Sequence, residues 1–427
     1  MNKKQKRFFW ILVILIVLLA IIPAAKFLEI YNRTRHTFLC DKILIVIQSD
    51  DWGMCGVRDQ ETYDYLIEKG FALDEDPWGV YSLETAEDLQ KLYNVMGKHH
   101  DSGGNPPIMT CNFILTNPDY SAIESSGFQV YKTITIAEGL PDQWPIYNLF
   151  PAYKTGITNG FIYPGYHGRE HFNSDEWLNL LRKNDRAAKA LFKKQMTFGY
   201  AALWEKIYGE YFISPDTFRP YTAQQEVIQD GVRLFKNIFG FSPLTTGAPG
   251  YLWNDDTEKI WYENGIRIIQ AGNRQHMGIS AHGKILRGRE RTMGEKNDLN
   301  MIYLTRNFDF EPWLFPRDLQ SYLDEIELLV QTGEPVVISS HSINYISRLK
   351  NYRDRTLPIF DKLLGAIEDR YTDVYYITDA QLAQAINEGS FETRNNKTVQ
   401  IHKKSGFIHI FSASLRMIVY KIKQRIQ

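Results

Sequence analysis

Residues 43–53 read ILIVIQSDDWG, and this stretch decides what kind of fold the chain adopts. Five apolar residues in a row, four of them β-branched, are typical of a strand that is buried on both faces of a parallel sheet. In folds built on such sheets, chemistry occurs where the strands end and the loops begin. We therefore expect residues 43–47 to form an inner strand, with Asp50 and Asp51 at its carboxyl end.

Apolar runs alternate with helical patterns along the rest of the chain. The predicted strands are 108–115, 244–249, 266–270, 335–341 and 374–377, and the predicted helical segments are 58–69, 82–100, 175–209, 222–238, 255–264, 317–332, 355–370 and 379–387. This alternation indicates an α/β fold with a mainly parallel sheet, either open or closed into a barrel. Asn112 and His341 then fall at strand ends, as Asp50 and Asp51 do.

Composition narrows the class of protein. The chain has 427 residues, 44% hydrophobic and 23% charged, which suits one large globular domain or two ordinary ones. A net charge of −1 gives no strong field for nucleic acid, so no nucleic-acid partner is expected. Three scattered cysteines are too few for a disulfide framework. The aromatic fraction of 14% suits either sugar-binding rings or an aromatic-rich core, and the oligomeric state stays open.

The N-terminus combines a basic segment, 1–7, with an apolar run, 8–25, that is about long enough to cross a bilayer. We therefore expect a single-pass membrane protein with a cytoplasmic segment 1–7, a transmembrane anchor 8–25 and a linker 26–40. The domain 41–390 would then lie outside the cytoplasm. A signal peptide cleaved near Pro23-Ala24-Ala25 is the alternative.

The C-terminal segment 391–427 is predicted to be a basic amphipathic tail. Residues 401–427 hold six Lys or Arg residues and no acidic residue, with apolar residues between them. Such a segment could lie on an anionic membrane surface. A terminal helix that packs on the domain explains the pattern equally well.

Asp50 and Asp51 are adjacent carboxylates that follow a buried strand. They repel each other and cannot both be buried without partners. Neighbours in extended chain point to opposite sides, so one could bind a metal while the other transfers a proton. An Asp turn or a helix N-cap is the structural alternative.

The segment YHGREH at 166–171 carries two histidines, His167 and His171, four residues apart. If the segment were helical, both rings would lie on one face and could share one ion. Two imidazoles and one carboxylate leave a divalent metal with open positions for water and substrate. With ten histidines in the chain, this spacing alone could also arise by chance.

His341 follows a late apolar strand and lies among serines. A histidine in a polar loop at a strand end suits a general acid that protonates a leaving group. A structural histidine held by hydrogen bonds is the alternative.

Together these motifs resemble the polysaccharide deacetylase family of carbohydrate esterases. The matching segments, which span about 41–390, are SDDWG (49–53), HGREH (167–171), VVISSHS (336–342) and VYYITDAQLAQAI (374–386). The resemblance implies a distorted (β/α) barrel. It also implies removal of N-acetyl or O-acyl groups from a polysaccharide or glycan by a metal-dependent hydrolase.

The resemblance also implies residue roles. Asp50 would be the general base and His341 the general acid, and the metal, with zinc as the first choice, would be bound by Asp51, His167 and His171. The segment GAPGYLW (247–253) best fits the place of the family's Arg-Pro-Pro motif. Substrate contacts are therefore expected from Trp52, Pro249, Tyr251 and Trp253.

Several departures leave other functions open. Gly168 replaces the family's Ser or Thr. The gap between the first and second motifs is long, so we expect an insertion near 120–165 that reshapes the cleft. Arg306 and Glu311 could supply a replacement charge or form a surface ion pair. A glycoside hydrolase on a related barrel could pair Asp50 with Asp309 or Glu311. A membrane-tethered, non-catalytic glycan-binding protein is the third possibility.

Overall fold

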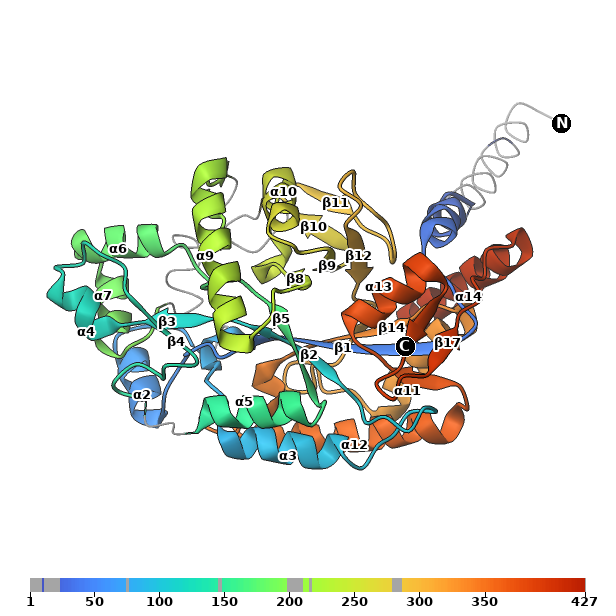
Figure 1. Ribbon diagram of the computed structural model, residues 1–427, viewed down its shortest axis with the longest axis horizontal. Coiled ribbons are helices and arrows are strands. Elements are labelled where there is room, and N and C mark those ends of the chain that lie inside the picture. Colours follow the sequence, from blue (N-terminus) through green and yellow to red (C-terminus); the bar gives the residue numbers. More distant parts are fainter. Residues whose placement is uncertain are drawn as a thin grey trace.

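The computed structural model describes residues 10, 24–73, 77–144, 148–197, 210–214, 217–278 and 286–426 (Figure 1). The predicted anchor 8–25 lies outside these residues, apart from Trp10 and residues 24 and 25. Among the described residues, no helix is both long enough and apolar enough to cross a membrane. This finding contradicts the predicted single-pass membrane localisation.

A nine-stranded parallel sheet forms the centre of the fold. Its strands, in spatial order, are β12 (Ile302–Thr305), β9 (Ile268–Ala271), β8 (Thr245–Gly247), β5 (Ile162–Tyr166), β2 (Met109–Phe113), β1 (Ile43–Trp52), β14 (Val336–His341) and β13 (Phe308–Asp309), while β15 (Val374–Tyr376) pairs with the start of β1. The sheet is curled into a half-barrel and flanked by helices (Figure 1). The predicted α/β class is thus confirmed at the level of a (β/α)-barrel-like fold.

Strand β1 is central because its β-branched side chains are buried on both faces of the sheet. Ile47 pairs with Ile338 of β14 on one side and with Met109 of β2 on the other. The strand runs on to Trp52, beyond its predicted end, and its register against β2 shifts between Ser49 and Trp52. This bulge lies where the two aspartates occur, so it re-aims their side chains.

Helices cover both sides of the sheet. The longer ones are α2 (Gln60–Glu68), α3 (Ala86–Met96), α5 (Leu149–Thr158), α9 (Tyr221–Phe239), α10 (Asp255–Glu263), α11 (Leu319–Thr332), α12 (Arg353–Arg370) and α13 (Asp379–Glu388). Helices α3, α5 and α12 lie side by side below the strands, whereas α9 and α10 lie above them (Figure 1). The apolar faces of α3, α5, α9, α10, α11 and α12 enclose one large core with the strands, whereas α2 and α13 pack in two separate apolar clusters.

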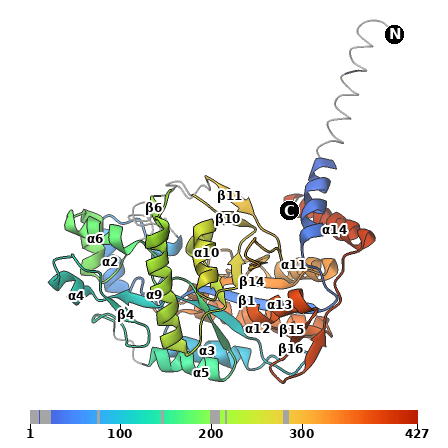
Figure 2. The same ribbon diagram turned by 45° about the horizontal axis from the view of Figure 1, so that its top comes forward.

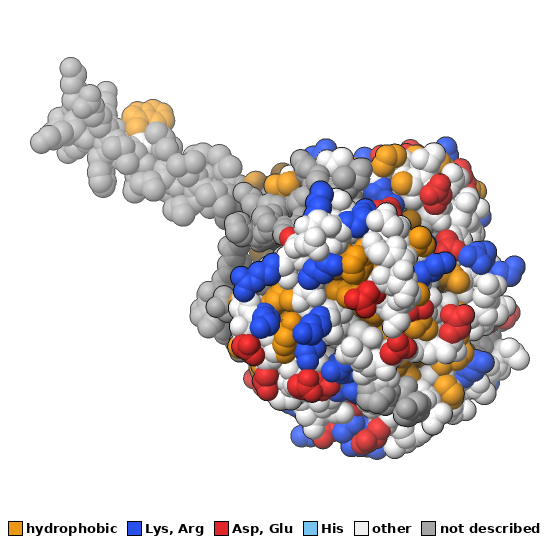
Figure 3. Space-filling model, turned by 90° about the vertical axis from the view of Figure 1, so that its left-hand side faces the viewer, with side chains coloured by type: hydrophobic (Ala, Val, Ile, Leu, Met, Phe, Trp, Pro, Cys, Tyr) orange, Lys and Arg blue, Asp and Glu red, His pale blue; other side chains and the backbone are white. Residues whose placement is uncertain are grey.

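A lobe at one end of the fold contains α2 and three further helices, α4 (Tyr120–Ser125), α6 (Ser174–Arg182) and α7 (Arg186–Lys193). The helical segment predicted from residue 175 is broken here, because Asn184 has a φ of 55° and Asp185 caps α7 through two backbone N–H groups. Figure 3 views the molecule from this end, where basic and acidic side chains are interspersed.

Short antiparallel strand pairs and 3-10 turns lie in the connections between the main strands and helices. The pairs are β3 (Thr116–Pro118) with β4 (Thr133–Thr135), β6 (Phe212–Ser214) with β7 (Thr217–Phe218), β10 (Arg274–His276) with β11 (Gly288–Glu290), and β16 (Ser390–Glu392) with β17 (Thr398–Gln400). The 3-10 turns are η1 (Pro77–Val80), η2 (Pro249–Tyr251) and η3 (Ser342–Tyr345). Residues 120–165, which have no clear periodicity in sequence, thus supply α4, β4, α5 and most of β5.

The two ends of the described chain pack together (Figure 2). Residues 24–36, most of which belong to the predicted linker, are helical and lie against α14 (Phe407–Ile426). The Phe27 and Phe411 ring centroids are 5.1 Å apart, and Thr34 Oγ1 donates a hydrogen bond to Met417 Sδ. The C-terminal helix therefore contacts the chain through part of its apolar surface.

Candidate metal centre and active site

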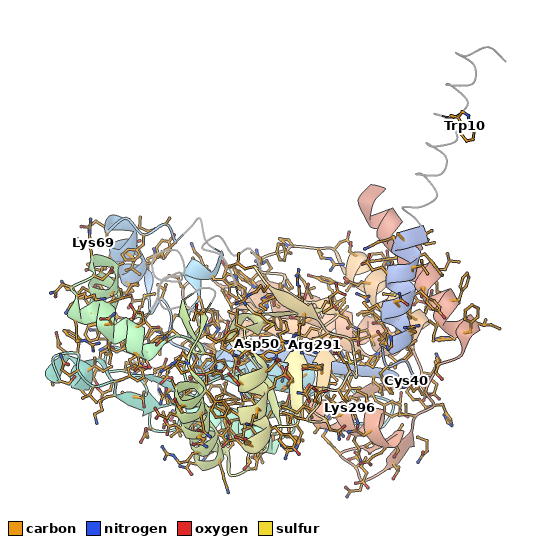
Figure 4. The ribbon with its side chains drawn as sticks, turned by 90° about the horizontal axis from the view of Figure 1, so that it is seen from above. Trp10, Cys40, Asp50, Lys69, Arg291 and Lys296 are labelled. Atoms are coloured by element: carbon orange, nitrogen blue, oxygen red, sulfur yellow. The ribbon has the colours of Figure 1, made fainter. Side chains whose placement is uncertain are left out.

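The candidate site lies at the carboxyl ends of the central strands. In the parallel pairing of β1 with β14, Asp50 stands opposite His341. Figure 4 places Asp50 in the middle of the molecule, far from Trp10 in the N-terminal segment. The register of two buried strands thus brings together two residues that are 291 positions apart in sequence.

Asp51, His167 and His171 converge on one point. Asp51 Oδ1 lies 3.3 Å from Nε2 of His167 and 3.3 Å from Nε2 of His171. All three side chains are buried, and one possible ligand atom from each lies within 4.8 Å of the others. The histidines do not lie on a helix, which was the condition for their spacing to place both rings on one face. They lie in the irregular loop that follows β5.

The local backbone explains why Asp51 turns away from Asp50. Asp51 has a φ of 69°, a left-handed conformation that a residue other than glycine rarely adopts. Its carbonyl oxygen accepts a hydrogen bond from the Tyr81 hydroxyl. A strained aspartate at a bulge, held by a neighbouring hydroxyl, is typical of a functional position.

These residues fit a divalent metal ion. Asp51 Oδ1 is buried but accepts no hydrogen bond from any residue that the structure describes. A carboxylate oxygen buried in this way is costly unless a cation compensates it. His167 Nδ1 contacts the Gly247 carbonyl at 2.6 Å and can donate to it, which leaves the Nε2 lone pair directed at Asp51. Two imidazoles and one carboxylate could hold zinc with positions left for water and substrate.

Asp50, by contrast, forms an ion pair with a side chain of the protein itself. Arg306 donates from Nη1 to Oδ2 and from Nη2 to Oδ1, both at 2.7 Å, and Asn112 donates to Oδ1 at 2.6 Å. Burial by itself would raise the pKa of Asp50, but the Arg306 guanidinium outweighs it and the pKa is lowered. Arg306 was proposed from sequence as a replacement charge or half of a surface ion pair; since it is 5% exposed, the surface alternative is wrong.

His341 is oriented by Glu311. His341 Nδ1 lies 2.7 Å from Glu311 Oε1, while Glu311 Oε2 accepts from Trp313 Nε1 at 2.8 Å and from Asn344 Nδ2 at 2.6 Å. Nε2, the other ring nitrogen, faces Asp50 Oδ2 at 3.9 Å. Burial by itself would lower the pKa of His341, but Glu311 and the two aspartates raise it to about 9.

A buried polar network supports the Asp50–Arg306 pair. Asp379 accepts hydrogen bonds from Gln48, Gln270 and Thr245, and Arg306 Nε donates to Gln48 Oε1. Sequence reasoning missed Gln48, Gln270 and Asp379 as supporting residues. The available signal was that Gln48 and Gln270 each adjoin or end an apolar strand run. Buried polar groups require hydrogen-bond partners, so two such residues predict a buried polar network.

Three of the four predicted substrate contacts are buried. Trp52 and Trp253 are both 0% exposed, and their Nε1 groups donate to Ser49 and Glu258. Pro249 is also buried. A substrate at the carboxyl ends of the strands would not reach these side chains, which serve the core instead.

Tyr251 is the predicted contact that does lie at the site. It is partly exposed, has a φ of 57°, and its hydroxyl accepts a hydrogen bond from Arg306 Nη1 at 3.2 Å. Sequence reasoning missed Trp78, whose partly exposed ring lies 4.6 Å from the His341 ring and 5.1 Å from the Trp313 ring, between centroids. Trp78 belongs to no motif, so the sequence carried no signal for it.

Comparison with protein families identifies the chain. The family model that matches is Glycosyl hydrolase family 57, over residues 190–412, just over half of the chain. The chain belongs to glycosyl hydrolase family 57. This membership places it among hydrolases that act on carbohydrates, whereas the sequence motifs resembled those of the polysaccharide deacetylases. The matched segment of this family 57 chain contains Arg306, Glu311 and His341, but not Asp50, Asp51, His167 or His171.

Solved structures similar to this family 57 chain include both deacetylases and glycosidic enzymes. A putative polysaccharide deacetylase from Mycobacterium smegmatis has a TM-score of 0.40 and 11% identity, covering 81% of this chain and 91% of that one. The 4-alpha-glucanotransferase from Thermococcus litoralis has a TM-score of 0.41 and 9% identity, covering 80% and 40%. The α-amylase AmyC from Thermotoga maritima has a TM-score of 0.40 and 9% identity, covering 81% and 75%. These low scores do not choose between the two classes, and no curated protein matches the chain.

Proposed function

We propose that this family 57 chain is a metal-dependent hydrolase that removes an acyl group, in the first instance N-acetyl, from a polysaccharide or glycan. Family membership supports a carbohydrate substrate. The observation that carries the choice of bond is the buried cluster of Asp51, His167 and His171, with a carboxylate oxygen that lacks a hydrogen bond from the described residues. Hydrolysis of a glycosidic bond by two carboxylates requires no such cluster.

The proposed chemistry divides between two carboxylates. A divalent metal bound by Asp51, His167 and His171 would lower the pKa of a water molecule and polarise an acyl carbonyl. Asp50 Oδ2 accepts the proton of the attacking water, and Arg306 keeps that oxygen in place and Asp50 ionised. Asp50 is a weak base, which suffices only for a water that is already acidified.

His341 supplies a proton to the leaving group. Its raised pKa of about 9 keeps the imidazole protonated at neutral pH, and Glu311 fixes the ring so that Nε2 faces Asp50. A sugar amine or hydroxyl that leaves from this side would take the Nε2 proton. The proposed acid and base thus stand opposite each other on the paired strands β14 and β1.

Glycosidic-bond hydrolysis is the second candidate, favoured by the family match. It requires two carboxyl groups that are free to act on either side of the bond. Both oxygens of Glu311 are engaged with neighbouring side chains, so this carboxyl group is not free to act with Asp50 on a glycosidic bond. The contacts of Glu311 and the buried cluster therefore favour acyl hydrolysis, although the family name favours glycosidic chemistry.

One assay separates the two candidates. The full chain, loaded with zinc, is incubated with an N-acetylated glycan, and both acetate and new reducing ends are measured. We expect acetate without new reducing ends, and loss of acetate release after chelation. New reducing ends that persist in chelator would establish the glycosidase instead. A chain that binds glycan but releases neither product would be a binding protein.

A further inference from the structure

The buried carboxyl group of Glu210 accepts hydrogen bonds from the loop that carries the two candidate histidine ligands. Glu210 is 1% exposed and precedes β6. Its Oε1 accepts the backbone N–H groups of Arg169, at 3.0 Å, and of Glu170, at 3.1 Å. These two residues lie between His167 and His171, so one side chain fixes the peptide groups that set the spacing of both rings.

Gly168 shows how closely Glu210 and this loop fit. Gly168 has a φ of 97°, which side chains rarely tolerate. A Cβ atom there would lie 2.7 Å from Glu210 Oε2 and 2.8 Å from the Glu170 carbonyl oxygen. The Ser or Thr expected at position 168 is therefore excluded, and Glu210 fills the space where its side chain would be.

The loop has a second tether on its other side. Arg169 Nε donates to both oxygens of Glu170, at 2.7 and 2.8 Å, and its Nη1 donates to Asp230 at 3.0 Å. The Arg169 side chain is thus held by α9 and by its own neighbour. These contacts fix the side chain of Arg169. Its peptide groups are held separately: the backbone N–H donates to Glu210, and the carbonyl oxygen accepts hydrogen bonds from the N–H and Oγ1 groups of Thr116.

We infer that Glu210 is a positioning residue for the metal centre. By holding the Arg169 and Glu170 peptides, it makes the Nε2 atoms of His167 and His171 converge on Asp51. Partners that orient metal ligands in this way commonly contribute about 10–100-fold to metal affinity. The inference rests on the proposed function, since it requires that the cluster binds a metal.

The test measures zinc affinity of the full chain by competition with a chelator. We expect Glu210→Ala to weaken zinc binding by about 10–100-fold. Glu210→Gln keeps an amide oxygen in the same place and should weaken binding least. Glu210→Asp keeps a carboxyl group but withdraws its oxygens, so it should fall between the two, and it decides the matter if the alanine variant does not fold.

Glu258→Ala is the matched control. Glu258 is another buried glutamate, which accepts hydrogen bonds from Trp253 and Tyr303, away from the loop. This variant should unfold at a lower temperature but bind zinc as the wild type does. Equal zinc affinity in the two alanine variants, or wild-type affinity in Glu210→Asp with weak binding in Glu210→Gln, would overturn the positioning role. A wild-type chain that binds no zinc would overturn the proposed function as well.

Discussion

Asp50 and Asp51 are neighbours in sequence but have opposite environments. Asp50 has its compensating cation within the protein, because Arg306 donates to both of its oxygens. Asp51 Oδ1 faces two imidazole nitrogens instead, with no hydrogen bond from the described residues. Buried carboxylates need compensation. This difference is the basis for our proposal that Asp50 transfers a proton and that Asp51 binds a divalent metal ion.

The two sides also differ in their relation to the family. The proton-transfer side, with Arg306, Glu311 and His341, lies within the segment that matches glycosyl hydrolase family 57, apart from Asp50 itself. The side of the candidate metal ligands, Asp51, His167 and His171, lies before that segment. Variants on the two sides should therefore separate metal binding from turnover.

The largest expected effect comes from removing the imidazoles. The double variant His167→Ala plus His171→Ala should lose nearly all bound metal, because only one of three ligands remains. We expect about one zinc per full-length wild-type chain and almost none in the variant, measured by elemental analysis. His402→Ala, an exposed histidine elsewhere, is the control. Equal metal content in all three proteins would remove the site as assigned.

The Asp50→Asn variant tests whether Asp50 acts in proton transfer and not in metal binding. It leaves the three metal ligands intact but removes the base, so zinc content should be retained while kcat falls by about 10²–10⁴-fold. Arg306 would then be a buried charge without its ionic partner, which should lower the free energy of unfolding by about 3–5 kcal/mol. Asp51→Asn is the matched variant, expected to lose metal. If both variants lost metal alike, the division between the aspartates would be wrong.

The Glu311→Gln variant tests whether His341 is the general acid, through the pH dependence of kcat/KM. In the wild type the alkaline limb of kcat/KM should lie near pH 9, where His341 loses its proton. Without the glutamate charge the pKa of His341 should fall toward its ordinary value of 6.5, and the limb should move to lower pH. A pH–rate profile at constant zinc measures the shift. An alkaline limb that stays in place would assign the proton to another group.

The same variant has a consequence for stability. The pKa of His341 is higher in the folded chain than its ordinary value, so protonation stabilises the fold below pH 6.5. That contribution should disappear as pH rises through about 9. Thermal unfolding of the wild type should show this loss, and Glu311→Gln should show less of it.

The strand ends could be predicted from the sequence because short apolar runs that finish in polar residues have few interpretations. The runs at 43–47 and 335–341 became the paired strands β1 and β14, whose register puts Asp50 opposite His341. The pairing of Arg306 with Asp50 could only be guessed, because it depends on contacts 256 residues apart. Long-range pairing leaves no periodicity in a single sequence.

Two other features depended on information that local patterns lack. The spacing of His167 and His171 resembled one face of a helix, but Gly168 takes a positive φ and the segment forms a loop. Trp52 and Trp253 were expected to contact substrate because they lie within the motifs, yet both are fully buried. The direction of a side chain at a strand end depends on bulges and packing, which sequence position does not reveal.

The smallest expected effect concerns a side chain on the proton-transfer side. Trp78 is partly exposed beside His341, so its ring could receive the apolar face of a sugar, whereas the buried Trp52 could not. An aromatic contact contributes about 0.5–1.5 kcal/mol, so Trp78→Ala should raise KM by roughly 2–10-fold with zinc content unchanged. Trp52→Phe should lower the unfolding temperature without changing KM. If Trp78→Ala left KM unchanged, or if it reduced zinc content, substrate binding and metal binding would not be separate properties of the two sides.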